Sequence, residues 1–151
     1  MRVMYVASEA TPFIKSGGLA DVIGSLPKET AKKDVESIVV IPKYQDMKFV
    51  DQIEYVTNFD IYMGWRKAEV DGVTFYFIDN EQYFGRPGLY GYDDDYERFA
   101  FFDFAVLELI SHLNIKPDVL QLNDWQTAMI AMLYKERYCY YDYYQNIEIV
   151  F

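Results

Sequence analysis

The sequence predicts an α/β domain with a doubly wound, mostly parallel sheet, and two observations carry this prediction. A short apolar strand, Arg2 to Ala7, leads into a loop with the pair Gly17-Gly18, after which apolar residues recur at helical spacing to about Lys33. The run from Ile38 to Ile41 is continuously apolar and β-branched, as in a parallel strand buried on both faces. Sheets built from such strand, helix and strand units bind ligands beyond the carboxyl ends of their strands.

The later elements follow from changes in pattern. Asp71-Gly72 lies between two strand-like segments, a two-residue hairpin signal, so an antiparallel insertion is expected between Glu54 and Asp79. Further helices are predicted over about Tyr96 to Leu113 and Trp125 to Tyr138, and strands over Val119 to Leu122 and Ile147 to Phe151. Because no crossover follows the last strand, residues 1–151 are expected to be one domain of a longer protein.

Composition narrows the class of protein. A chain of 151 residues with 52% apolar content can build one sizeable core, and the 19% aromatic content is expected to be mostly core filler. A formal net charge of −10 argues against nucleic acid as a partner. The single cysteine indicates a reducing compartment, and the apolar amino terminus is too short for a signal peptide or a membrane span. We therefore expect a cytoplasmic protein without a membrane partner.

The loop after the first strand is the first candidate site. The backbone amides of Gly17 and Gly18, at the start of the predicted helix, would face an anion placed there, and Lys15 adds a positive charge. Diphosphate binding is one interpretation, and a structural turn with a solvent-exposed lysine is the other. The segment is neither a Walker A sequence nor a G-x-G-x-x-G fingerprint.

The second candidate follows the strand Val119 to Leu122 and falls at the same edge of the sheet. It comprises Asn123, Asp124 and Trp125. One of the two polar residues could instead be only a helix cap, and Trp125 could be only a core residue.

A third candidate is the loop Arg86 to Gly91 with the residues that follow it. Tyr90 and Arg98 supply aromatic and guanidinium groups near several carboxylates, a mixture that suits recognition of a polyhydroxyl compound. The alternative is an ordered surface loop in which Arg98 pairs with a nearby carboxylate. The sole histidine, His112, is expected to be a solvated cation near a helix end. With one His and one Cys, neither a metal site nor a cofactor is expected.

The segment Lys15 to Val22 reads Lys-Ser-Gly-Gly-Leu-Ala-Asp-Val, and it resembles the first loop of the ADP-glucose type glycogen and starch synthases of bacteria and plants. Other segments resemble landmarks of the same family in the same order: Ser8-Glu9, Pro12, Phe77 to Asn80, Arg86 to Gly91, Glu97 to Phe99 and Pro117 to Trp125. The resemblance covers nearly the whole chain. It implies the amino-terminal, acceptor-side half of a two-domain GT-B glycosyltransferase with Rossmann-like domains, whose carboxyl-terminal donor-binding domain is absent from this chain.

The resemblance also implies an activity, the transfer of glucose from ADP-glucose to the non-reducing end of α-1,4-glucan with retained configuration. Lys15 and the amides of Gly17 and Gly18 would contact the donor's diphosphate or glucose, and Asp21 belongs to the same motif. The fragment alone would have little activity. The chain's own carboxyl-terminal domain, the donor and the glucan are the implied partners.

The resemblance gives Asn123 the place that histidine has in many bacterial members and asparagine in plant ones. Its amide could orient a sugar hydroxyl but could not carry a proton. Asp124 would fix the local backbone or bind a hydroxyl, and Tyr90 and Arg98 complete the implied substrate-binding set.

Two passages depart from the family pattern by being short, around residues 33–36 and 45–49. Two other functions stay open from the sequence. One is a glucan-binding or regulatory module without catalysis, and the other is a different two-domain glycosyltransferase, such as a relative of sucrose synthase.

Overall fold

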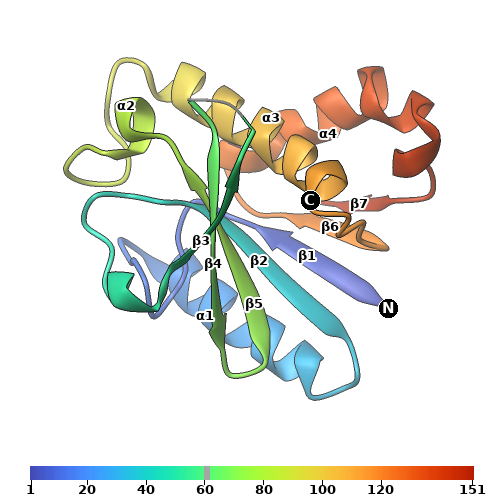
Figure 1. Ribbon diagram of the computed structural model, residues 1–151, viewed down its shortest axis with the longest axis horizontal. Helices are drawn as coiled ribbons and strands as arrows, with labels where there is room; N and C mark the ends of the chain where they lie inside the picture. The colour runs from blue at the N-terminus through green and yellow to red at the C-terminus, as the bar shows by residue number, and fades with distance from the viewer. Residues whose placement is uncertain (60–61) are drawn as a thin grey trace.

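Over the residues that the structure, a computed structural model, describes (1–59 and 62–151), seven strands form one mixed sheet in the order β3-β4-β5-β2-β1-β6-β7 (Figure 1). The strands are β1 (Arg2–Val6), β2 (Glu36–Pro42), β3 (Glu54–Asn58), β4 (Gly64–Val70), β5 (Val73–Asp79), β6 (Val119–Leu122) and β7 (Glu148–Val150). The helices are α1 (Gly18–Ala31), α2 (Glu81–Phe84), α3 (Asp95–His112) and α4 (Ala128–Glu136), and short 3-10 turns are η1 (Val50–Gln52), η2 (Trp125–Thr127), η3 (Tyr138–Tyr140) and η4 (Asp142–Tyr144).

The centre of the sheet is parallel, as predicted. β1 pairs with β2 and β6, β2 also pairs with β5, and β6 pairs with β7, all in parallel. Residues 38–42 of β2 are all buried, which explains why this strand is apolar without alternation.

The antiparallel hairpin has its turn at Asp71-Gly72, where the sequence predicts it. β4 and β5 pair in antiparallel register with Val70 opposite Val73, and β3 adds to the outer side of β4. Asp71 and Gly72 have φ angles of 51° and 79°, the left-handed conformation that a two-residue type I′ turn needs at both positions.

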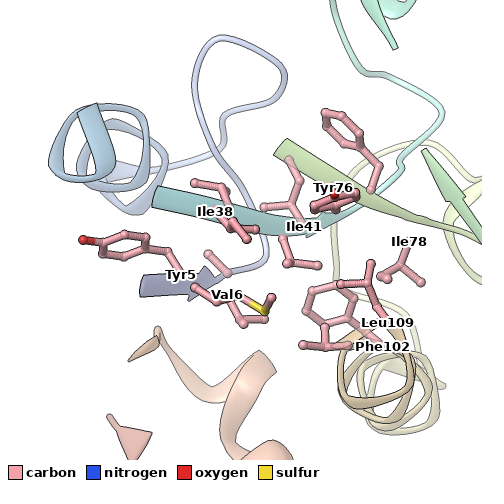
Figure 2. Packing of buried hydrophobic residues seen from close by; sticks show 14 of the residues in the cluster. Tyr5, Val6, Ile38, Ile41, Tyr76, Ile78, Phe102 and Leu109 are labelled. Carbon is pink, nitrogen blue, oxygen red and sulfur yellow. The ribbon is translucent and has the colours of Figure 1, made fainter. Parts of the chain in front are cut away.

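Helices cover both faces of the sheet, so the doubly wound prediction is confirmed. α1 lies on one face, and α3 with α4 lies on the other (Figure 1). In the core, Phe102 and Leu109 of α3 lie beside Ile78, whereas Tyr5 points away from α3 (Figure 2) and shares a hydrogen bond of 2.9 Å with Thr30 of α1.

The predicted helix from Trp125 to Tyr138 is wrong in its continuity, because it divides into η2, α4 and η3. The residues after α4 form two 3-10 turns that bind α3 through tyrosine hydroxyls. Tyr138 donates to Glu108 Oε1 at 2.5 Å, and Tyr144 donates to the carbonyl of Leu107 at 2.6 Å. No glycine or proline between Trp125 and Tyr144 marks this division in the sequence.

The two short passages each turn through a left-handed residue. Asp34, between α1 and β2, and Phe49, just before η1, both have a φ angle of 58°. This conformation is unusual for a bulky side chain such as phenylalanine.

Candidate active site

Three loops that the sequence singles out lie together at the carboxyl edge of the sheet. The loops after β1 and β5 extend to the left in Figure 1. The Ser16 and Tyr90 hydroxyls share a hydrogen bond of 2.8 Å, which joins the loop after β1 to the loop after β5. Asn123 Nδ2 donates to the carbonyl of Val6 at 2.9 Å, which joins the end of β6 to the end of β1. The predicted convergence on one edge is therefore confirmed.

A buried carboxylate holds the glycine loop in place. Glu9, only 3% exposed, accepts hydrogen bonds from the backbone N–H groups of Ser16 and Gly17. The sequence predicts Glu9 only as a family landmark; its hold on this loop was not predicted, although a glutamate directly after a buried strand is an available signal.

The glycine amides are not equivalent, which refines the anion prediction. The Gly17 N–H already binds Glu9 at 3.2 Å, so it is not free to meet a ligand. Gly18 begins α1, and the space where its Cβ would stand is open to 4 Å. Because the N-cap residue Gly17 has no side chain that could cap α1, the first turn of the helix favours an anion.

The Lys15 ammonium group lies beside this amino terminus and binds Asp21 in the first turn of α1 at 2.5 Å. Both side chains are about half exposed, so solvent screens the pair and its contribution to stability is small. Lys15 and Asp21, predicted together as site residues, are thus in direct contact at the surface.

The packing of α1 against the loop sets the loop's position. A Cβ atom on Gly24 would come within 1.8 Å of Thr11 Oγ1 and 2.9 Å of the Thr11 carbonyl oxygen. The Thr11 N–H donates to the carbonyl of Ala20 at 3.0 Å. Only a glycine at position 24 allows this close approach.

Arg98, which was predicted to bind substrate, is held by groups of its own loop in this structure. Its side chain is fully buried, and its guanidinium donates to Asp95 Oδ1 at 2.6 Å and to the carbonyl of Tyr83 at 2.7 Å. It also lies over the Tyr92 ring at 4.8 Å. The pairing with a carboxylate that was left open is therefore observed, in the interior rather than at the surface.

Arg98 and its partners shape the loop that presents Tyr90. The Arg98 Nη2 donates to the carbonyl of Leu89 at 3.3 Å, and Asp95 Oδ2 accepts the N–H of Gly91 at 2.6 Å. The Arg86 guanidinium donates a bidentate pair of hydrogen bonds, both 2.8 Å, to the Asp94 carboxylate. These bonds lower the pKa of Asp94. Tyr90 itself is about half exposed, so its side chain can meet a ligand.

Asp124 has a strained backbone at the end of β6. Its φ of 68° and ψ of 172° fall in a region that is almost restricted to glycine. Its carboxylate accepts the N–H of Trp125 at 2.7 Å and caps η2. Asp124 is therefore a helix cap, which was one of the two interpretations of this segment. Trp125 is about half exposed with its ring edge against Phe99, so it is not a core residue.

The comparison with known families decides what kind of domain this is. The family model of the starch synthase catalytic domain matches residues 2–151. The chain belongs to this starch synthase family. Over 161 aligned positions it is 52% identical to the glycogen synthase of Clostridium botulinum, and over 160 positions 50% identical to that of Streptococcus agalactiae. Each alignment covers all of this chain and 34% of the relative, so the chain spans about a third of their length.

A solved structure has the same fold. The catalytic domain of starch synthase IV from Arabidopsis thaliana, bound to ADP and acarbose, superposes with a TM-score of 0.86 and 31% identity, covering 97% of this chain and 32% of the other. The alignment with the Clostridium enzyme is ten positions longer than the chain, at 161 against 151 residues. This starch synthase domain is therefore shorter than its relative over the same region, in keeping with the two short passages.

His112 lies near the carboxyl end of α3, as predicted, but it is not simply solvated. Its ring packs against Phe59 at 4.5 Å and Trp65 at 5.2 Å between centroids. Within the described part of this starch synthase domain, no group of three or more His, Cys, Asp or Glu side chains could hold a metal ion. The described helices include none that is long and apolar enough to cross a membrane.

Proposed function

We propose that this chain is the amino-terminal, acceptor-side domain of a GT-B glucosyltransferase that transfers glucose from ADP-glucose to the non-reducing end of α-1,4-glucan with retained configuration. The observation that carries the proposal is the juxtaposition of Lys15, the uncapped start of α1 and Tyr90 at one sheet edge of a starch synthase family domain. The Arabidopsis relative, which is bound to ADP and acarbose, supports a nucleoside diphosphate and an oligosaccharide as ligands of this chain.

Lys15 and the Gly18 amide would stabilise charge on the leaving diphosphate. When the bond between the anomeric carbon and the diphosphate oxygen breaks, ADP keeps the bonding electrons, and the acceptor hydroxyl oxygen bonds to the same carbon. The hydroxyl proton leaves with a phosphate oxygen. A preorganised cation and amide in a closed cleft are each worth about 2–4 kcal/mol of barrier. For this, the Lys15 ammonium must exchange Asp21 for phosphate, which is easy for a half-exposed pair.

Asn123 would position the sugar rather than transfer a proton. Its Nδ2 donates to the carbonyl of Val6, and its Oδ1 accepts from Gln121 Nε2 at 3.3 Å. The Oδ1 atom can accept a second hydrogen bond, from a sugar hydroxyl. Asp124 would hold this orientation through its constrained backbone, and Tyr90 would contact the glucan.

The whole reaction needs more protein than this chain, which spans about a third of its relatives' length. We propose that a carboxyl-terminal α/β domain supplies most donor contacts and closes over the edge formed by Lys15 and Asn123. The chain alone would then be inactive. The single cysteine supports a reducing, cytoplasmic location for the complete enzyme.

The test is glucose incorporation into glycogen by the full-length protein, with ADP-glucose and UDP-glucose as alternative donors. The proposal predicts incorporation from ADP-glucose, none from the 151-residue chain alone, and linear α-1,4 extension of the acceptor. Efficient transfer by the isolated chain would contradict the domain assignment. No transfer by the full-length protein, with glucan binding retained, would favour the glucan-binding or regulatory module instead.

A further inference from the structure

A polar side chain, Gln121, stands in the otherwise apolar strand β6, two residues before Asn123. Leu120 and Leu122 of this strand are buried, whereas Gln121 is half-buried. Because successive side chains of a strand point to opposite faces, Gln121 lies on the face opposite to these two leucines. The proposed function gives Gln121 no role of its own.

The amide group of Asn123 is held at its nitrogen by two backbone carbonyl groups. Nδ2 donates to the carbonyl of Val6 at 2.9 Å and to that of Gln121 at 3.3 Å. An amide nitrogen carries two N–H groups, so both of its donors are used within the protein. Exchange of the nitrogen and the oxygen would set Oδ1 against two carbonyl oxygens. Asn123 therefore offers a ligand its oxygen and not its nitrogen.

The side chain of Gln121 holds that oxygen. Its Nε2 donates to Asn123 Oδ1 at 3.3 Å. An amide oxygen can accept two hydrogen bonds, so Oδ1 can take one more from a ligand. The ligand group must then be a donor. A sugar hydroxyl is such a donor, whereas the ionised diphosphate of a nucleotide sugar has only acceptors to offer.

We infer that Gln121 is a positioning residue, which directs the Asn123 Oδ1 atom toward a hydroxyl group of the transferred sugar. The inference rests on the proposed function, which places the sugar at Asn123. Gln121 acts only through the Asn123 amide and does not touch the substrate. Loss of this alignment should slow the chemical step rather than weaken binding of the donor, so kcat should fall more than KM changes.

The test is the rate of glucose transfer from ADP-glucose to glycogen by full-length variants. Gln121→Glu has nearly the same shape, but its carboxylate cannot donate and would repel the Asn123 oxygen. Gln121→Met removes the donor without adding a charge. We expect Gln121→Glu to lower kcat about fivefold to tenfold and Gln121→Met about threefold, with KM for ADP-glucose within about twofold of wild type.

Gln145→Glu is the matched control. The Gln145 side chain is exposed, and its Nε2 also donates to a side-chain oxygen, that of Asp142 at 3.4 Å. Gln145 precedes β7, whereas Asn123 follows β6, and these two strands are parallel, so the control lies at the opposite edge of the sheet. Its kcat should equal that of the wild type.

A double variant shows whether Gln121 acts through Asn123. In the Asn123→Ala background, Gln121→Glu should change kcat by less than about twofold, because the group that it directs is already absent. An equal loss in both backgrounds, or wild-type kcat in both Gln121 variants, would overturn the inference and leave the proposed function standing. No transfer by the wild type would overturn the proposed function and this role with it. Urea unfolding checks that each variant is folded, and Gln121→Met decides if Gln121→Glu is not.

Discussion

The loops after β1 and after β6 meet at the same sheet edge but are held in opposite ways. The loop after β1 is fixed from outside by the Glu9 carboxylate, which binds two of its N–H groups. The loop after β6 is fixed at Asp124, whose own backbone is strained. A residue that stabilises its loop is explained by folding alone. A residue that strains its loop points to a role in function.

Glu9 gives the largest expected effect on stability. Glu9→Ala removes the acceptor of the Ser16 and Gly17 N–H groups and should lower the free energy of unfolding by about 2–4 kcal/mol. Urea unfolding of the chain measures this loss. Glu9→Gln keeps an acceptor oxygen and should lose less than half as much. An unchanged midpoint in both variants would show that the loop holds its shape without this carboxylate.

Asp103 of α3 is a buried carboxyl group beside Trp125 and Gln126, which follow β6, so it tests how burial affects stability there. Its pKa is about 8 in the folded protein against 3.8 for an unperturbed group. The folded state therefore retains a proton that the unfolded chain loses, and this contribution to stability declines as pH rises from about 4 through 8.

Asp103→Asn has nearly the same shape and cannot ionise. Relative to wild type, its free energy of unfolding should increase by roughly 2–4 kcal/mol between pH 4 and pH 8, measured by urea unfolding at a series of pH values. A pH-independent difference between the two proteins would mean that Asp103 titrates normally in the fold.

Asp124 gives the smallest stability change and the sharpest contrast. Asp124→Gly loses the bond to the Trp125 N–H but relieves the strained conformation, so its free energy of unfolding should exceed that of Asp124→Ala by about 1 kcal/mol, while transfer by the full-length protein falls. Asp124→Ala keeps the strain and loses the bond to the Trp125 N–H, so it should be less stable than wild type. If glycine lowered stability as alanine does, the strain would not be a real feature of the loop.

The sequence predicted the fold well where local pattern decides it. Continuous apolar runs identified the buried strands, and Asp71-Gly72 identified the hairpin because its conformation depends on those two residues. The division of the last helix was not predictable, because tertiary bonds from Tyr138 and Tyr144 to α3 determine it.

The sequence predicted which loops form the candidate site, but not the hydrogen bonds that hold them. Lys15 and Asn123 were placed at one edge because parallel strands end together, whereas the position of Tyr90 beside them was not predicted. The anchoring by Glu9 and the burial of Arg98 were not predicted, because burial of a charged side chain depends on partners distant in sequence.

The most direct test of the central claim is glucose transfer from ADP-glucose to glycogen by the full-length protein with Lys15→Ala or Asn123→Ala. Lys32→Ala is the matched control, because Lys32 is also an exposed lysine paired with a carboxylate, at 2.6 Å from Glu29. We predict that Lys15→Ala lowers kcat about 100-fold or more, that Asn123→Ala lowers it about tenfold or more, and that Lys32→Ala is active as wild type. Near-normal rates in the first two variants would contradict the assignment of these loops to the catalytic site.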